Sequence, residues 1–272
     1  MIKKKALTIA GSDSGGGAGI QADLKTFQEL DVFGMTALTA VTAQNTLGVQ
    51  AVYPMTAEAV VKQIEAIGDD LGADAVKTGM LFSAEIIEAV SGKLTQYQWE
   101  NIVIDPVMIA KGGASLLQQE AIMALKKYLL PLATVITPNI PEAEVLTGMK
   151  IKTIEEKKEA AKRLWNFGVS HVVIKGGHDE NHSESKDILF DGKDFYSFTS
   201  KRVLTSNTHG TGCTFSAAIT AELAKGADVY KAVLKAKDFI QAAIEDDLRI
   251  GGGHGPTNHW AYRKRVSKGV LK

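Results

Sequence analysis

The chain has a single cysteine, no net charge and no long hydrophobic run among its 272 residues. One thiol cannot form an internal disulfide, which favours a reducing compartment. Balanced charge with scattered lysines argues against a nucleic-acid partner. Because no apolar run reaches about 18 residues, we expect no membrane span. These absences favour a soluble, cytoplasmic globular protein.

Short β-branched segments alternate with helical patterns, and 45% of the residues are hydrophobic. Strands are predicted at 6–10, 73–76, 101–104, 133–136 and 171–174, with a hairpin of 188–190 and 195–198. Helices are predicted from about Gln21, over 60–71, from a capping sequence at 153–156 to about Phe167, and from Phe215 to Gly226. This alternation predicts an α/β fold with a mainly parallel central sheet and helices on both faces. The length suits one domain over residues 1–272.

Polar or glycine-containing segments follow five of the predicted strands. They are residues 11–19, 77–80, 105–107, 137–139 and 175–178. Ligands of open α/β sheets bind beyond the carboxyl ends of the strands, so we expect these segments to form one shared site. Two polar stretches, 111–115 and 178–186, are interpreted as mobile loops.

The sequence Asn-Thr-His-Gly-Thr-Gly-Cys-Thr at 207–214 predicts an anion site. A glycine-rich turn before a helix directs unpaired N–H groups and the helix dipole at one spot. Cys213, the only cysteine, lies in this turn, where a thiolate is favoured, so it is a candidate base or nucleophile. These eight residues also fit a buried small side chain in a glycine turn, and they do not separate the two interpretations.

Spacing excludes several common motifs. The glycine-rich stretch 11–19 is not a P-loop, because Leu24 stands where glycine is required, and Ile20 likewise breaks the dinucleotide fingerprint. His178 and His182 lack the HExxH pattern of zinc enzymes, and no G-x-S-x-G elbow follows a strand. The stretch 11–19 remains either a ligand-binding loop or a tight turn.

Hard oxygen ligands and a lysine occur at the predicted strand ends. Asp105, Asn139 and Glu142 suit a loose, water-mediated Mg²⁺ site. Asn139 and Glu142 equally suit the cap of a helix near Pro141. Lys175 is either a cation that phosphate can approach or an ordinary surface lysine.

Taken in order, these motifs resemble the ribokinase-like superfamily, in its vitamin-kinase branch, and most closely the hydroxymethylpyrimidine/phosphomethylpyrimidine kinases. The resemblance covers residues 6–23, 43–46, 77–80, 105–108, 137–139, 175–178, 208–214 and 253–256. It implies a three-layer ribokinase-like fold. It also implies phosphate transfer from ATP·Mg²⁺ to an aminopyrimidine alcohol, and then to its monophosphate, in thiamine biosynthesis. A homodimer is expected on the same ground.

The resemblance also implies roles for individual residues. The pyrimidine is expected to be held by Gln44, Gly11, Asp23, Met80 and Val107, and the nucleotide by Lys175, Thr205 and Asn139. Asp105 and Glu142 are expected to hold Mg²⁺, and the reaction centre is expected at Gly210, Thr211, Gly212 and Cys213. The superfamily commonly has an aspartate base at the position of Cys213, whereas the pyrimidine kinases have cysteine. A carboxamide such as Gln44 also complements the donor and acceptor on an aminopyrimidine edge.

Two other functions are considered. Pyridoxal kinases similar to this branch share the Gly-Thr-Gly-Cys turn but carry a second cysteine in the loop after the Asp-Pro-Val-Met strand. Ala110 occupies the corresponding place here, which favours the pyrimidine. A non-catalytic ligand-binding regulator is disfavoured, because no part of the expected catalytic set is lost.

Overall fold

The computed structural model describes residues 3–108, 119–177 and 183–269. Within these residues one nine-stranded sheet has the order β3-β2-β1-β4-β5-β6-β7-β8-β9. The strands are β1 (Lys5–Asp13), β2 (Phe33–Asn45), β3 (Gly48–Pro54), β4 (Ala75–Thr78), β5 (Ile102–Ile104), β6 (Val135–Ile136), β7 (His171–Ile174), β8 (Glu184–Phe190) and β9 (Phe195–Lys201).

The centre of the sheet is parallel and its two edges are antiparallel. Strands β2, β1, β4, β5, β6 and β7 pair in parallel, whereas β3 pairs antiparallel with β2, and β8 with both β7 and β9. The prediction of a mainly parallel sheet is confirmed, with every predicted strand present. Strands β2 and β3 were not predicted. Much of β2 alternates between buried and partly exposed side chains, so it lacks the continuous apolar run that reveals the other parallel strands.

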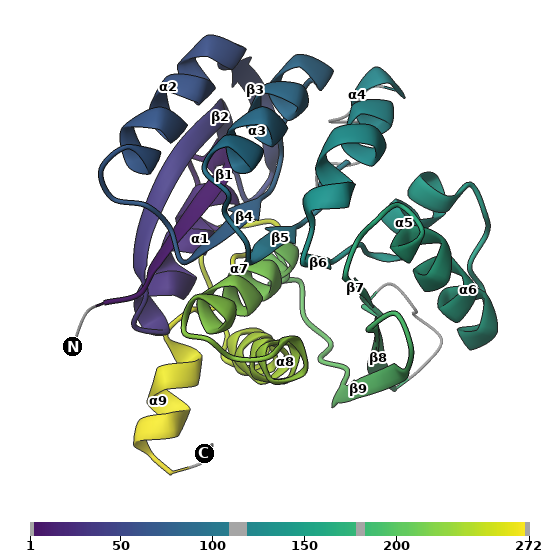
Figure 1. Cartoon of the computed structure of the whole chain (residues 1–272). Helices are drawn as coiled ribbons and strands as arrows, with labels where there is room; N and C mark the ends of the chain where they lie inside the picture. The colour runs from purple at the N-terminus through teal and green to yellow at the C-terminus, as the bar shows by residue number, and fades with distance from the viewer. Residues whose placement is uncertain (1–2, 109–118, 178–182, 270–272) are drawn as a thin grey trace.

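Helices cover both faces of the sheet, which confirms the three-layer arrangement (Figure 1). One hydrophobic cluster packs α2 (Ala57–Gly68), α3 (Ala84–Gln96), α4 (Gln119–Ala124), α5 (Ile140–Thr147) and α6 (Ile154–Trp165) on the sheet. The other packs α1 (Gly19–Glu29), α7 (Thr211–Ala224), α8 (Val229–Glu245) and α9 (Ala261–Ser267) on the opposite face. Every side chain of α7 from Thr214 onward is buried, as its small apolar sequence predicts.

Several predicted boundaries need correction. The helix predicted to reach Leu71 ends at Gly68, and Leu71 is exposed. Strand β8 begins at Glu184, so the end of the loop predicted over 178–186 is wrong. The loop predicted at 111–115 lies outside the described residues. Thr153 and Glu156 form the predicted capping box at the start of α6, which is confirmed.

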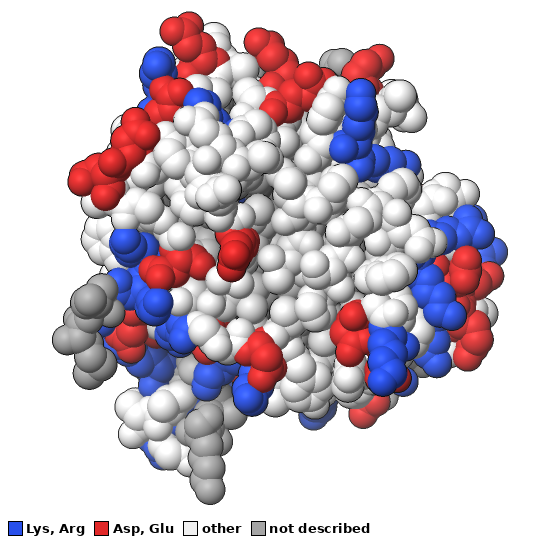
Figure 2. All heavy atoms as spheres, in the orientation of Figure 1, with Lys and Arg blue, Asp and Glu red and all other residues white. Residues whose placement is uncertain are grey.

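The surface carries mixed charge. On the face in Figure 2, Lys and Arg alternate with Asp and Glu around the rim, and the described residues there form no extended patch of one sign. Among the described residues, no helix combines the length and apolar character needed to cross a bilayer.

Candidate active site

A cavity of about 570 Å³ opens at the carboxyl ends of the parallel strands. Its wall includes residues from the ends of β1, β2, β4, β5, β6 and β7, together with the first turn of α7. This is the edge at which open α/β sheets bind ligands, so the expected shared site is confirmed as a pocket. The sequence-predicted residues in its wall are Gly11, Gln44, Met80, Val107, Asp105, Asn139, Glu142, Lys175, Gly210, Thr211, Gly212 and Cys213.

One end of the pocket is apolar and closely packed. A Cβ at Gly11 would lie 2.5 Å from Cε of Met80, so glycine at this position leaves room for the methionine side chain in the wall. Val107 lies in the same wall, and Gln44 contributes a carboxamide from the end of β2. This end therefore combines apolar contacts with one carboxamide that carries both a donor and an acceptor, which suits a small heteroaromatic ring.

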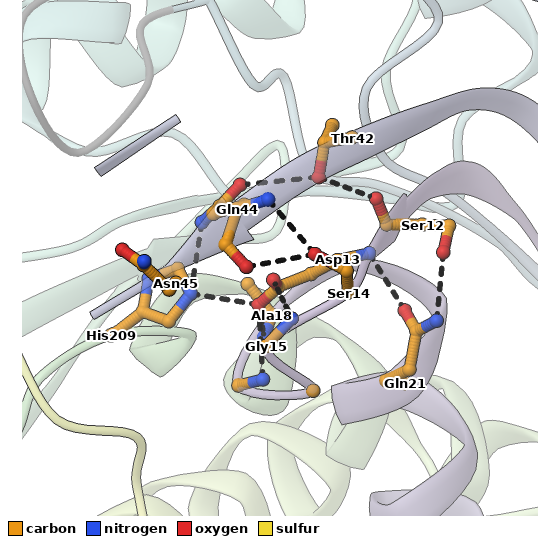
Figure 3. Close-up of polar contacts among 12 residues, drawn as sticks. Ser12, Asp13, Ser14, Gly15, Ala18, Gln21, Thr42, Gln44, Asn45 and His209 are labelled. Atoms are coloured by element: carbon orange, nitrogen blue, oxygen red, sulfur yellow. Dashed lines mark hydrogen bonds and ion pairs between the residues drawn. The ribbon is translucent and has the colours of Figure 1, made fainter. Parts of the chain in front are cut away.

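The glycine-rich segment after β1 is organised by Asp13. The carboxylate of Asp13 accepts hydrogen bonds from the backbone N–H groups of Gly15, Gly17 and Ala18. Its Oδ2 also lies 2.8 Å from Nε2 of His209, in the turn before α7 (Figure 3). Burial raises the pKa of Asp13, but these hydrogen bonds outweigh it and the pKa is lowered. The side chain thus holds the loop as an ionised acceptor.

The turn before α7 is packed directly against this loop. Gly210 has a φ of +82°, and a Cβ there would lie 1.8 Å from the carbonyl oxygen of Gly17. Both conditions require glycine. Helix α7 then begins at Thr211, and Thr211, Gly212 and Cys213 of its first turn line the pocket, where N–H groups at the start of a helix lack intrahelical partners. The N–H of Thr211 donates to Thr208 O at 3.3 Å. The prediction of a glycine turn before a helix is confirmed, but the helix begins at Thr211 and not at Phe215, so Cys213 lies in its first turn.

Cys213 is a neutral thiol in this environment. Burial raises its pKa to about 12, and the carboxylates of Asp23 and Asp105 act in the same direction. The ammonium of Lys77 and the backbone N–H of Gly19 oppose the rise without cancelling it. The expectation that a thiolate is favoured here is therefore wrong, because burial and the two carboxylates outweigh the opposing effects of Lys77 and the Gly19 N–H.

A buried ion pair lies close enough to Cys213 to act on its pKa. Nζ of Lys77 is 2.9 Å from Oδ2 of Asp23, and both side chains are fully buried. The hydroxyl of Thr8 donates to the same carboxylate oxygen at 2.6 Å. Burial raises the pKa of Asp23 while Lys77 and Thr8 lower it. Asp23 was predicted to hold the substrate, but it lies under the wall and not in it.

A second charged group lies at the ends of β5 and β7. Nζ of Lys175 is 3.2 Å from Oδ1 of Asp105, and a Cβ at Gly212 would lie 3.3 Å from the same Nζ. The ammonium therefore lies against the first turn of α7. Burial lowers the pKa of Lys175, but the carboxylates of Asp105 and Glu142 raise it by more, so the net pKa is raised and the lysine stays charged.

Asn139 and Glu142 form the capping box of α5. The side chain of Asn139 accepts from the N–H of Glu142 at 2.9 Å, and Glu142 Oε2 accepts from the N–H of Asn139 at 2.8 Å. The helix cap that the sequence offered as an alternative to a metal site is therefore present at these two residues. Burial, with a further contribution from Asp105, raises the pKa of Glu142 to about 7 although Lys175 lowers it. Asp105 and Glu142 therefore make a site where negative charge is incompletely balanced, which fits a divalent cation.

The donor set is too small for a cation held by protein alone. No three His, Cys, Asp or Glu side chains are grouped to hold a metal ion within residues 3–108, 119–177 and 183–269. Mg²⁺ commonly uses one or two carboxylates with waters and phosphate oxygens, which Asp105 and Glu142 match. His178 and His182, excluded as zinc ligands, lie outside the described residues.

Thr205 does not lie in the wall of the pocket. Its hydroxyl oxygen accepts a hydrogen bond from the N–H of Asn207 at 3.1 Å, so its observed contact is within its own loop. Its expected contact with a nucleotide stays a prediction.

Sequence reasoning missed the roles of Lys77 and His209. Both lie in motifs singled out for other residues, and neither was assigned a function. Lys77 lies in strand β4, whose four residues are all buried, and a charge directly after Ala75 and Val76 is unusual there, which is the one signal that could have found it. His209 carried no comparable signal, because its partners Asp13 and Gln44 are 196 and 165 residues away.

The fold and the pocket define a small-molecule kinase of the ribokinase-like class. A family model described as phosphomethylpyrimidine kinase matches residues 13–258, and the chain belongs to that family. It is 56% identical to a hydroxymethylpyrimidine/phosphomethylpyrimidine kinase of Bacillus subtilis, with 96% of each chain covered. It is 57% identical to the enzyme of the same name from Haemophilus influenzae, covering 96% of this chain and 98% of that one.

A solved structure extends the comparison to ligands. The pyridoxal kinase from Staphylococcus aureus in complex with AMP-PCP and pyridoxal has a TM-score of 0.90 and 42% identity, over 97% of this chain and 96% of that one. That protein binds AMP-PCP, an ATP analogue, together with pyridoxal. Relatives named for different acceptors share this fold, so the residues of the site and not the fold carry the choice of acceptor.

Proposed function

We propose that the protein phosphorylates 4-amino-5-hydroxymethyl-2-methylpyrimidine with ATP, and then phosphorylates the monophosphate to the diphosphate, in thiamine biosynthesis. The observation that carries this proposal is one continuous pocket that joins Gln44 and the apolar end to the first turn of α7. An acceptor ring and a phosphate site in one cavity are the two requirements of such a transfer.

At the acceptor end, Gln44 pairs with the amino group and adjacent ring nitrogen of the pyrimidine. Met80 and Val107 pack beside the ring, and Gly11 leaves room for Met80. Asp23 does not contact the substrate in this proposal. It supports the pocket from below through its ion pair with Lys77.

At the phosphate end, the N–H groups of Gly210–Cys213 and the ammonium of Lys175 stabilise charge on the transferred phosphoryl oxygens. ATP supplies the phosphate, with Mg²⁺ held by Asp105 and Glu142 and neutralising phosphate charge when bound. The nucleotide continues toward an apolar wall that includes Val203, Phe215, Ile240 and Ile244, with Asn139 and Thr205 expected on the nucleotide side.

Cys213 has two candidate roles in the transfer. As a base it would accept the hydroxyl proton, and as part of the anion site it would only position the hydroxyl. A thiol with a pKa of about 12 supports the positioning role. Cys213→Ala separates the two, because loss of a base lowers kcat by about 10²–10⁴ and loss of a positioning contact lowers it far less.

The product stoichiometry tests the whole proposal. Purified protein with ATP, Mg²⁺ and the pyrimidine alcohol is expected to release two ADP per acceptor and to yield the diphosphate by mass spectrometry. EDTA is expected to stop both steps. Release of ADP without a phosphorylated pyrimidine would refute the acceptor assignment.

Pyridoxine phosphorylation is the second candidate function, because the superposed pyridoxal kinase shares 42% identity and nearly the full length. Against it, this chain has Ala110 where those relatives have a second cysteine, although Ala110 lies outside the described residues. We further propose that the chain acts in the cytoplasm as a single domain and as a homodimer. Sedimentation velocity tests the dimer, and a monomer at assay concentration would refute it.

A further inference from the structure

His209 joins three parts of the pocket. Its Nε2 lies 2.8 Å from Oδ2 of Asp13 and 3.0 Å from the side-chain nitrogen of Gln44 (Figure 3). Asp13 orders the glycine-rich loop, Gln44 stands at the acceptor end, and His209 itself directly precedes the turn of α7. A single ring nitrogen thus contacts both the loop and the acceptor-binding amide.

The histidine ring is held in a fixed position. A Cβ at Gly17 would lie 2.6 Å from Cδ2 of His209, so the loop packs directly on the ring. The backbone N–H of His209 donates to Gly255 O at 3.1 Å, and the N–H of Thr257 donates back to His209 O at 3.3 Å. The ring cannot move away from Gln44 without disturbing the loop or the C-terminal segment.

The contact with Asp13 fixes where the ring carries a proton. An ionised carboxylate is only an acceptor, and Asp13 already accepts three backbone N–H groups. At 2.8 Å, Nε2 of His209 must therefore carry hydrogen and donate it to Asp13. A ring N–H has no lone pair to offer the neighbouring amide.

The carboxamide of Gln44 must consequently present oxygen to His209. The two ends of a carboxamide exchange by rotation about its terminal bond, and only the hydrogen-bond network decides between them. Thr42 completes that network, because its hydroxyl donates to Ser12 O at 2.8 Å and its oxygen is left to accept. This oxygen lies 3.4 Å from the other end of the Gln44 amide, where an NH₂ group satisfies both partners.

We propose that His209 is a positioning residue that sets the orientation of the Gln44 amide and thereby selects the acceptor. With oxygen toward His209 and nitrogen toward Thr42, Gln44 offers one oxygen lone pair and one N–H to the pocket. An aminopyrimidine edge matches this pair, whereas the ring nitrogen of pyridoxine has no amino group beside it. This inference rests on the proposed acceptor role of Gln44.

Two substitutions separate the hydrogen bond of His209 from its volume. His209→Met keeps an elongated side chain without a donor, and His209→Gln restores an N–H near the position of Nε2. We expect His209→Met to lower the ratio of kcat/KM for the pyrimidine to kcat/KM for pyridoxine by about tenfold, mainly through KM for the pyrimidine. His209→Gln is expected to recover most of the ratio, and exposed His254→Asn is the matched control that leaves it unchanged.

A direct measurement of the proton does not depend on activity. Nitrogen-15 NMR of the wild-type protein, with His209 assigned by its loss in His209→Gln, is expected to find Nε2 protonated. A ring with hydrogen on Nδ1 alone would overturn the proposal, whatever the folding of the variants. An unchanged acceptor ratio in folded His209→Met would overturn it equally.

Gln44→Leu distinguishes failure of this inference from failure of the proposed function. If Gln44→Leu leaves pyrimidine kcat/KM unchanged, then the acceptor assignment of Gln44 is wrong and the inference fails with it. If Gln44→Leu removes the preference but His209→Met does not, the acceptor assignment stands and the role of His209 is refuted.

Discussion

Lys77→Met is expected to destabilise the protein more than any change on its surface. The substitution removes the only cation within hydrogen-bond distance of the Asp23 carboxylate among the described residues. The Oδ1 atom of that carboxylate already has no hydrogen-bond partner, and Oδ2 would keep only the hydroxyl of Thr8. Breaking a buried pair in this way costs about 3–5 kcal/mol, because the remaining charge stays buried. In a chain of this size the melting temperature is expected to fall by roughly 10 °C.

The pH dependence of this loss follows from the chemistry of Asp23. Without Lys77, burial raises the pKa of Asp23 further, and the carboxyl group can relieve its charge by taking up a proton. The destabilisation is therefore expected to be larger at pH 8 than at pH 5. Urea unfolding at both pH values measures it, with the double variant Lys77→Met/Asp23→Leu expected to recover most of the stability.

Lys62→Met is the matched control for the assay. Lys62 is also in an ion pair with a carboxylate, that of Glu65 at 2.8 Å, but its side chain is 69% exposed. Exposed pairs contribute little, so this variant is expected to unfold with the wild-type midpoint. If Lys77→Met unfolded like Lys62→Met at both pH values, the ion pair of Lys77 and Asp23 would not contribute the stability that its burial implies.

Three further predictions concern the pocket. The single thiol of Cys213, with a pKa of about 12, is expected to react with iodoacetamide at pH 7.5 about a thousandfold more slowly than an exposed cysteine, and mass spectrometry that finds ordinary reactivity would contradict the raised pKa. Glu142 binds its proton more tightly when folded, with a pKa of about 7 against 4.5, so stability is expected to fall by up to about 3 kcal/mol as pH rises from about 4.5 to about 7. Glu142→Gln should abolish that part of the slope in urea unfolding, and an identical slope would refute it. Gly210→Ala, whose Cβ would lie 1.8 Å from Gly17 O, is expected to abolish transfer. Gly226→Ala is the control, because Gly226 has a similar positive φ of +88° but open space around its Cβ, so it introduces the same backbone strain without the clash and is expected to stay active in the ATP assay. Equal activities would contradict the packing of loop against turn.

Much of the fold could be predicted because its local signals are strong. Three of the four residues of strand β7 are β-branched, and α6 carries both residues of its capping box, so each was found from a few adjacent positions. Strand β2 was missed because its side chains face surroundings that alternate between core and surface. Only the pairing with β1 and β3 explains why the segment is extended.

The residues of the candidate site also divide into those that local sequence predicts and those that depend on distant parts of the chain. Cys213 and Lys175 could be placed at the pocket because each follows a recognisable turn or strand end. Asp23 was misplaced, because its burial depends on the register that sets Thr8 opposite Lys77 in neighbouring strands. The prediction of a favoured thiolate at Cys213 was wrong for a related reason. The local turn favours the thiolate, whereas the burial and carboxylates that dominate come from distant parts of the chain.

A competition experiment tests the central claim most directly. Equimolar 4-amino-5-hydroxymethyl-2-methylpyrimidine and pyridoxine are incubated with the protein, Mg²⁺ and limiting ATP, and both phosphorylated products are quantified by mass spectrometry. Their ratio reports relative kcat/KM without separate kinetics. We predict that phosphate goes predominantly to the pyrimidine, with its diphosphate accumulating as ATP is added. Predominant pyridoxine phosphate would contradict the assignment of Gln44 as the amide that selects the acceptor.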